Sequence, residues 1–240
     1  MCPPYATTLY VGSVDKMGGS IYENNGQYVD NEKWKHIKWV CVGDSLTERN
    51  YRSPIFYHDY INEKTSIQVV NMGQSGSGYK RKDDSNNAFF QRILNVPTDA
   101  DIVTIFGSGN DLNHISVLGD ITDTSTDTLC GCINTTINNL YTIIPTVQLG
   151  IISPTPWVNN QPSNNGAMAR YVEKLKAICE NRGIPFLDLF HCSGFRPNEE
   201  EYRNLVYSND DGNGVHPNEI GHKIISSHIY NFLNSLIGTY

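Results

Sequence analysis

Clusters of positive charge and long hydrophobic stretches are both absent from this sequence. Its 18 Lys and Arg residues are outnumbered by 25 Asp and Glu residues, and the formal net charge at pH 7 is −7. Proteins that bind nucleic acid or an anionic membrane surface carry basic patches, so we expect neither nucleic acid nor membrane as a partner. No apolar stretch reaches the roughly 20 residues that a membrane-spanning helix needs.

Signals of several other protein classes are missing as well. The sequence has no Gly-x-Ser-x-Gly motif, which disfavours the α/β-hydrolase fold, and no phosphate-binding loop. Its six cysteines match no standard zinc-ligand spacing, so no metal site is expected. The first residues lack the charged and apolar regions of a signal peptide, so we expect none. The compartment stays open between the cytoplasm and a larger surface or virion assembly.

What the sequence does contain, from residue 37 onward, is a regular alternation of two apolar patterns. Short β-branched runs bounded by turn residues predict strands at 37–42, 67–72, 102–106, 147–152 and 186–190. Between them, apolar residues recur with the period of half-buried helices, which predicts helices at 53–64, 87–94, 127–144, 166–181 and 218–237. Strands that alternate with helices predict an α/β fold whose parallel sheet is covered on both faces.

Residues 1–36 differ from the rest in composition. They are rich in Gly, Tyr, Asn and Asp and contain only short alternating pieces, such as 8–11 and 20–22. We interpret them as an N-terminal extended arm or small β element, and residues 37–240 as the main domain. Such an arm either packs on the domain or holds a partner chain, which would give a homo-oligomer or a larger assembly. A partly ordered terminus explains the same composition.

The predicted loops that follow the strands carry residues suited to acyl transfer. In an open parallel sheet these loops converge at one edge, where such folds place their chemistry. Ser45 follows the first predicted strand, and His216 precedes the last predicted helix. Ser45 could attack a carbonyl carbon if His216 removed its proton and later returned it to the leaving group. Each residue also has a purely structural explanation, since Ser45 could cap a helix and His216 could simply begin one.

Donors for the negatively charged oxygen of such a reaction can be proposed from the same loops. The candidates are the backbone N–H groups of Ser45 and Gly73 and the side-chain amide of Asn110. A glycine at position 73 would let the backbone approach a substrate closely. Gly73 and Asn110 are also typical turn residues, so neither is diagnostic alone. The occurrence of all these residues in order, each next to the expected element, favours the catalytic interpretation.

Together these segments resemble the sequence blocks of the SGNH hydrolase superfamily, also called the GDSL esterases and lipases. Residues 43–46 resemble the nucleophile block, and Gly73, Asn110 and His216 match the second, third and last blocks. The resemblance runs from about residue 38 to the C-terminus and does not cover the N-terminal arm. It implies a flavodoxin-like three-layer α/β/α sandwich with a five-stranded parallel sheet. It also implies ester hydrolysis through an acyl-serine intermediate, without a cofactor.

The residue that would orient His216 departs from the family pattern. The family places an aspartate three residues before the histidine, and this sequence has Asn213 there. An asparagine can orient an imidazole but lends no charge to the imidazolium that forms. Asp211 lies two residues further upstream, and we favour it as the partner of His216, because Gly212 and Gly214 can take the unusual backbone angles that a bulged loop would need. A weaker Ser–His pair, or a site that binds without catalysis, would also explain an asparagine at position 213.

The substrate is less clearly indicated by the sequence. Trp157, in the loop after the fourth predicted strand, could stack on a sugar ring or pack beneath that proline-rich loop. Asn159 could bind hydroxyl groups, and Tyr79 is expected near the same edge of the sheet. No long apolar lid is visible, so we expect short acyl esters, such as O-acetyl groups on carbohydrate. A non-catalytic carbohydrate-binding module on the same scaffold, and a lysophospholipase or thioesterase, are the competing hypotheses.

Overall fold

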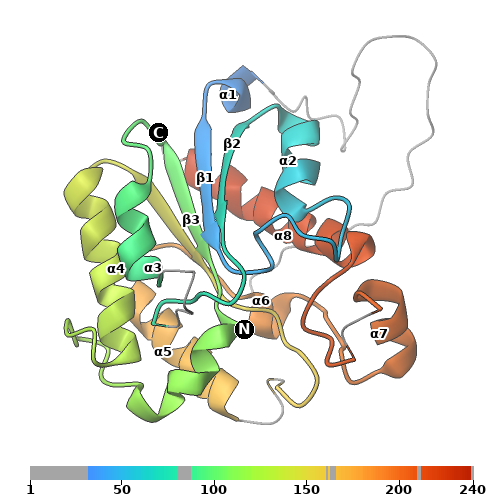
Figure 1. Cartoon of the computed structure of the whole chain (residues 1–240). Coiled ribbons are helices and arrows are strands. Elements are labelled where there is room, and N and C mark those ends of the chain that lie inside the picture. Colours follow the sequence, from blue (N-terminus) through green and yellow to red (C-terminus); the bar gives the residue numbers. More distant parts are fainter. Residues whose placement is uncertain (1–31, 81–87, 161, 163–165, 210–211, 239–240) are drawn as a thin grey trace.

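The computed structural model describes residues 32–80, 88–160, 162, 166–209 and 212–238. These residues contain a parallel sheet of five strands in the order β2-β1-β3-β4-β5 (Figure 1). Its strands are β1 (Lys38–Gly43), β2 (Gln68–Gly73), β3 (Ile102–Phe106), β4 (Gln148–Ile152) and β5 (Phe186–Leu187). The five-stranded α/β/α fold that the sequence predicts is confirmed.

The strand order reverses between β1 and β3, and this reversal positions the functional site. From β1 the chain first goes outward to β2, and then returns to pair β3 with the other side of β1. The register places Gly43 beside both Gly73 and Phe106, so three strands end level with one another. In open α/β sheets, ligands bind outside the carboxyl ends of the strands at such a reversal.

Helices cover both faces of the sheet because side chains of each strand point alternately to opposite faces. Val40 and Val42 of β1 belong to one apolar cluster, and Trp39 and Cys41 belong to the other. The first cluster is closed by α3 (Phe89–Arg92), α4 (Leu129–Ile143) and α5 (Ala167–Arg182). The second is closed by α2 (Tyr57–Thr65) and α8 (Glu219–Ile237), which lie on the opposite face in Figure 1. None of the described helices is long and apolar enough to cross a membrane.

The last predicted strand is shorter than expected. The sequence predicts a strand over 186–190, but β5 ends at Leu187 and a short helix, α6 (Leu189–Cys192), begins at once. Asp188 causes the change, because its carboxylate accepts a hydrogen bond from the His191 N–H and caps α6. The remaining short elements are α1 (Glu32–Lys35), α7 (Glu200–Val206) and the 3₁₀ segments η1 (Ile93–Asn95) and η2 (Gly109–Val117).

The arm predicted over residues 1–36 lies mostly outside the described residues, but its last part is in the packed structure. Trp34 of α1 is completely buried, and its ring stacks on Tyr230 of α8 with a centroid distance of 5.4 Å. Trp34 also belongs to the apolar cluster that contains Trp39. The hydrophobic core therefore already includes a residue that lies before the domain boundary expected at residue 37.

Candidate active site

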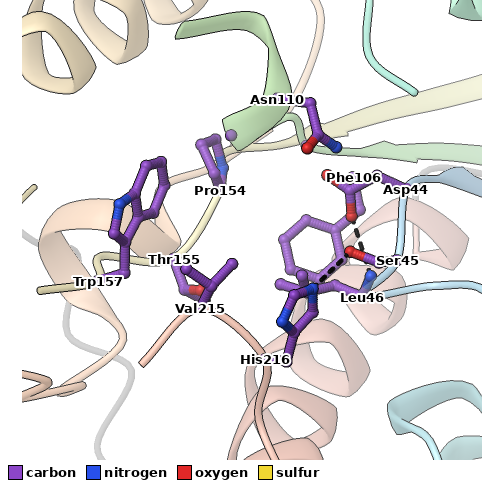
Figure 2. A pocket seen from close by; sticks show the side chains of 12 residues that line it. Asp44, Ser45, Leu46, Phe106, Asn110, Pro154, Thr155, Trp157, Val215 and His216 are labelled. Atoms are coloured by element: carbon purple, nitrogen blue, oxygen red, sulfur yellow. Dashed lines mark hydrogen bonds between the residues drawn. The ribbon is translucent and has the colours of Figure 1, made fainter. Parts of the chain in front are cut away.

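A small pocket opens at the carboxyl edge of the sheet, between the loops that follow β1, β3 and β4 and the segment that precedes α8. Its volume is about 190 Å³. Residues distant in the sequence meet there, and Figure 2 shows their side chains around a common space. The residues that line it include Ser45, Phe106, Asn110, Trp157, Val215 and His216.

Ser45 and His216 form the central contact of this pocket. The Ser45 Oγ lies 3.0 Å from the His216 Nε2, which is hydrogen-bonding distance (Figure 2). Ser45 comes two residues after the end of β1, and its carbonyl accepts a hydrogen bond from the Asn50 side chain. The His216 carbonyl accepts a hydrogen bond from the Ser208 N–H at 2.9 Å. Backbone on both sides of the contact is thus held, and the histidine is placed to take the serine proton.

Asp44, which immediately precedes Ser45, also lines the pocket and has hydrogen-bond partners of its own. Its side chain is 4% exposed, and its carboxylate accepts hydrogen bonds from the Leu46 N–H at 2.9 Å and the Ser108 hydroxyl at 2.7 Å. Burial raises the pKa of the Asp44 carboxyl, and the two hydrogen bonds oppose that rise. Asp44 therefore ties the nucleophile loop to the loop after β3.

The side-chain amide of Asn110 is oriented by two oxygen atoms. Its Nδ2 lies 2.9 Å from the Ser77 carbonyl oxygen and 3.1 Å from the Ser108 Oγ. A carbonyl can only accept, so the amide nitrogen must face Ser77. These two oxygens are 2.8 Å apart and lie on the same side of Nδ2. Asn110 is also one of the residues that line the pocket.

A comparison with known families shows which family contains this chain. The model of the GDSL-like lipase/acylhydrolase family matches residues 41–224, which is most of the chain. This chain belongs to the GDSL-like lipase/acylhydrolase family. The members of this family are hydrolases, and the pocket just described holds Ser45, Asn110 and His216, which resemble three of the family's four sequence blocks.

Solved structures share the fold of this GDSL-like protein. A protein from Lactobacillus plantarum is 25% identical with a TM-score of 0.71, over 83% of this chain and 97% of that chain. A family 3 carbohydrate esterase from Clostridium thermocellum is 20% identical with a TM-score of 0.56, over 85% and 98%. A carbohydrate esterase of family 3 from Talaromyces cellulolyticus is 18% identical with a TM-score of 0.60, over 85% and 99%. No curated protein matches the chain in sequence.

In this GDSL-like hydrolase, Gly73 does not have the role expected from the sequence. Its N–H donates to the Asn71 Oδ1 at 2.8 Å, and Gly73 is not among the described residues that line the pocket. A Cβ at position 73 would lie 2.2 Å from the Glu48 backbone nitrogen. The prediction of an oxyanion donor is therefore wrong for Gly73. The glycine instead lets β2 pack directly against the nucleophile loop.

The two candidates for orienting His216 differ in what the structure says about them. Asp211 lies outside the described residues. Asn213 is exposed, and its carbonyl accepts a hydrogen bond from the Val158 N–H at 2.9 Å. This bond joins the loop after β4 to the segment that carries His216. Which of the two residues orients the imidazole stays a prediction.

The predicted substrate residues divide into one that lies in the pocket and two that do not. Trp157 lines the pocket, and a Cβ at Gly109 would lie 2.8 Å from its indole, so the ring lies against the η2 backbone. Asn159 is exposed at the tip of a turn, with a left-handed φ of 63°, and is not among the described lining residues. Tyr79 is completely buried, with its ring 5.1 Å from that of Phe89.

The prediction of a substrate-binding role is therefore wrong for Tyr79. The chain turns inward after β2, because the Asp111 carboxylate accepts hydrogen bonds from the N–H groups of Tyr79 and Lys80. These bonds direct the Tyr79 ring into the apolar layer beneath the loop rather than to its surface. A sequence position close to a functional block does not determine which way its side chain points.

Two residues near the pocket were not singled out by the sequence. Ser108 directly follows the β3 loop glycine, and a polar residue just after a predicted strand is the same signal that selected Ser45. Arg92 is 4% exposed, and its guanidinium donates to the carbonyls of Met72 and Gly43 and to the Ser77 hydroxyl. Burial lowers the pKa of Arg92 to about 10. The helical pattern could not show that this arginine turns inward.

Proposed function

We propose that this chain is a serine esterase that removes short acyl groups, namely O-acetyl groups from carbohydrate, through an acyl-serine intermediate. The observation that carries the proposal is the 3.0 Å contact between the Ser45 Oγ and the His216 Nε2 inside a small pocket. Membership of a family of lipases and acylhydrolases supports the same class of reaction.

In the proposed mechanism, Ser45 attacks the ester carbonyl while His216 takes its proton. The negative charge that develops on the carbonyl oxygen is stabilised by the Ser45 N–H and the second N–H of the Asn110 amide. His216 then gives the proton to the departing alcohol, and the acyl group stays on the Ser45 oxygen. Water, deprotonated by His216, attacks this ester, and the acid is released with Ser45 restored.

The size of the pocket supports a short acyl group. Pockets that enclose drug-sized ligands have volumes of roughly 300–1,000 Å³, whereas this pocket has about 190 Å³. Phe106, Pro154 and Val215 supply apolar walls suited to a methyl group. The Trp157 indole at the same pocket offers a flat surface for a sugar ring. Carbohydrate esterases from two organisms share the fold, which is consistent with a carbohydrate substrate.

The test is hydrolysis of p-nitrophenyl acetate, butyrate and octanoate by purified protein and by the Ser45→Ala variant. We expect acetate to be the best substrate, and Ser45→Ala to lower kcat by on the order of 10⁴-fold or more, because nucleophile and base act as a unit. Ser226→Ala is the matched control, because Ser226 is a buried serine of α8 whose hydroxyl bonds to the Lys223 carbonyl.

Each competing function gives a different result in this experiment. Unchanged turnover in Ser45→Ala would exclude an esterase reaction at this site. Activity that rises with acyl length would indicate a lysophospholipase or thioesterase. Binding of acetylated oligosaccharide by a protein that hydrolyses none of the esters would indicate a binding module.

A further inference from the structure

We propose that Ser108, held by Asp44, is a positioning residue that orients the Asn110 amide toward the developing oxyanion. The inference rests on the proposed esterase function. Ser108 is completely buried and is not among the described residues that line the pocket, although its neighbours Gly107 and Gly109 line it. It therefore does not touch the substrate, and any effect on the reaction must pass through other residues.

The Ser108 hydroxyl lies at the centre of a cluster of polar atoms. Its Oγ is 2.7 Å from the Asp44 Oδ2 and 2.8 Å from the Ser77 carbonyl oxygen. The same Oγ is 3.2 Å from the Asn110 backbone nitrogen and 3.1 Å from the Asn110 Nδ2. A hydroxyl has one hydrogen to donate and two lone pairs with which to accept. The Ser108 hydroxyl can therefore donate to only one of these four neighbours, and it can only accept from the others.

The Asp44 carboxylate determines which neighbour receives the Ser108 hydroxyl hydrogen. Hydrogen bonds to an ionised acceptor are stronger than bonds between neutral groups, so the Ser108 hydrogen is directed to Asp44 rather than to the Ser77 carbonyl. Both Asn110 nitrogens face the oxygen of Ser108 as donors. Asp44 thereby keeps the Ser108 lone pairs available to the backbone and side-chain N–H groups of Asn110.

The consequence for Asn110 is a fixed amide plane. The Asn110 Nδ2 contacts both the Ser77 carbonyl and the Ser108 hydroxyl, so the planar amide cannot rotate without losing both partners. In the proposed arrangement these two oxygens share one Nδ2–H, and the other Nδ2–H is held in one direction before substrate arrives. Donors aimed in advance at the developing charge stabilise a transition state without reorganising during the reaction. A donor is effective only when it is held within about 0.5 Å of its productive position.

The first test is Ser108→Ala, assayed with p-nitrophenyl acetate. We expect kcat to fall roughly 10-fold with little change in KM, less than the roughly 10²–10³-fold expected for Asn110→Ala, because the donor remains but is no longer fixed. Ser226→Ala serves again as the matched buried-serine control. Asp44→Asn is the second variant, because its amide would donate to the Ser108 oxygen and compete with Asn110, and it should lower kcat similarly.

The deciding experiment is the double variant Ser108→Ala/Asn110→Ala. If Ser108 acts through Asn110, the double variant has the same kcat as Asn110→Ala alone. A full additional 10-fold loss in the double variant would overturn the proposal, because Ser108 would then act on the fold or on another group. The decreases in kcat are compared only among variants whose thermal melting curves match that of the wild type.

A second readout does not depend on turnover and separates this inference from the esterase proposal. In amide NMR spectra, the side-chain signals of Asn110 are assigned by their loss in Asn110→Ala. We expect the hydrogen-bonded Nδ2 hydrogen to exchange with solvent faster in Ser108→Ala than in wild type and Ser226→Ala. Equal exchange in all three proteins would overturn the positioning role, whereas failure of Ser45→Ala to reduce hydrolysis would overturn the function.

Discussion

At the scale of single residues, a buried histidine near the site is expected to control acid stability. His222 of α8 is 2% exposed, and its ring centroid lies 4.4 Å from that of Phe56. Burial, with smaller contributions from the nearby His58 and His216, lowers the pKa of His222 to about 3, and the Asp59 carboxylate opposes this shift. His222 is therefore neutral in the folded protein at pH values where an unfolded chain would protonate it, since a free histidine has a pKa near 6.5.

We predict that this histidine makes the protein lose stability between about pH 6.5 and pH 3. In that range the unfolded state binds a proton at position 222 and the folded state does not, so unfolding becomes more favourable as the pH falls. The shift corresponds to roughly 3 to 6 kcal/mol of unfolding free energy. Urea unfolding of His222→Phe at pH 7 and pH 4 should show a smaller difference than wild type. The exposed His36, replaced by Gln, is the control, and an unchanged difference in His222→Phe would contradict the prediction.

A second prediction at this scale concerns the group that orients His216. If Asp211 accepts the imidazole N–H, Asp211→Asn should lower kcat roughly 10²-fold or more, and Asn213→Ala should change it little. If Asn213 has this role, the order of the effects reverses, and Asn213→Asp should raise kcat because it adds the missing negative charge. Steady-state hydrolysis of p-nitrophenyl acetate by the three variants distinguishes these cases. If all three substitutions change kcat equally little, neither residue orients His216, and the site is a Ser–His pair without a side-chain acid.

At the scale of secondary-structure elements, the close approach of β2 to the nucleophile loop depends on Gly73. We predict that Gly73→Ala destabilises the protein by roughly 1–3 kcal/mol, because the new Cβ overlaps backbone and not a flexible side chain. Thermal unfolding measures the loss. Gly166→Ala is the control, because a Cβ at that position meets nothing within 4 Å. Equal melting temperatures for the Gly73 variant and wild type would show that β2 can move away without cost.

The elements also show where apolar periodicity is sufficient and where it fails. The long pattern at 127–144 predicts a helix, and α4 forms over Leu129–Ile143 with Thr128 as its cap. The short pattern at 186–190 is equally compatible with a strand or a helix, and the Asp188 side chain decides for a helix after two residues of strand. In a short apolar pattern such as this one, capping groups determine whether a strand or a helix forms. A pattern that extends over several helical turns predicts a helix by itself.

At the scale of the whole molecule, the N-terminal region is predicted to contribute stability through one tryptophan. Removal of residues 1–31 should leave hydrolysis of p-nitrophenyl acetate largely intact, because the pocket is lined by residues from 44 onward. Removal of residues 1–36 should also lower the unfolding free energy by roughly 3–5 kcal/mol, because it takes Trp34 from its buried contact with α8.

Chemical unfolding and hydrolysis assays on both truncations check this prediction. Trp34→Ala in the full chain is the control, since it removes the same contact and leaves the backbone in place. If removal of residues 1–31 abolishes turnover while the protein stays folded, the N-terminal segment contributes to the site. Equal stability of the two truncations would show that α1 is dispensable.

The sequence by itself determined the layered fold and the meeting of Ser45, Asn110 and His216, because both depend on local patterns. Apolar periodicity determines which segments become strands and helices, and a parallel sheet brings the loops after its strands to one edge. Ser45 and His216 are 171 positions apart in the chain, yet the order of the elements brings their segments to the same edge of the sheet.

Only the tertiary structure decided where individual hydrogen-bond donors and side chains point. The Gly73 N–H is taken by Asn71, Tyr79 turns into the core, and Ser108 joins Asp44 to Asn110. None of these outcomes follows from residue type or spacing, because the partner that a polar group selects depends on which atoms of other elements come within about 3 Å of it. That selection is made only once the sheet and its covering helices have packed.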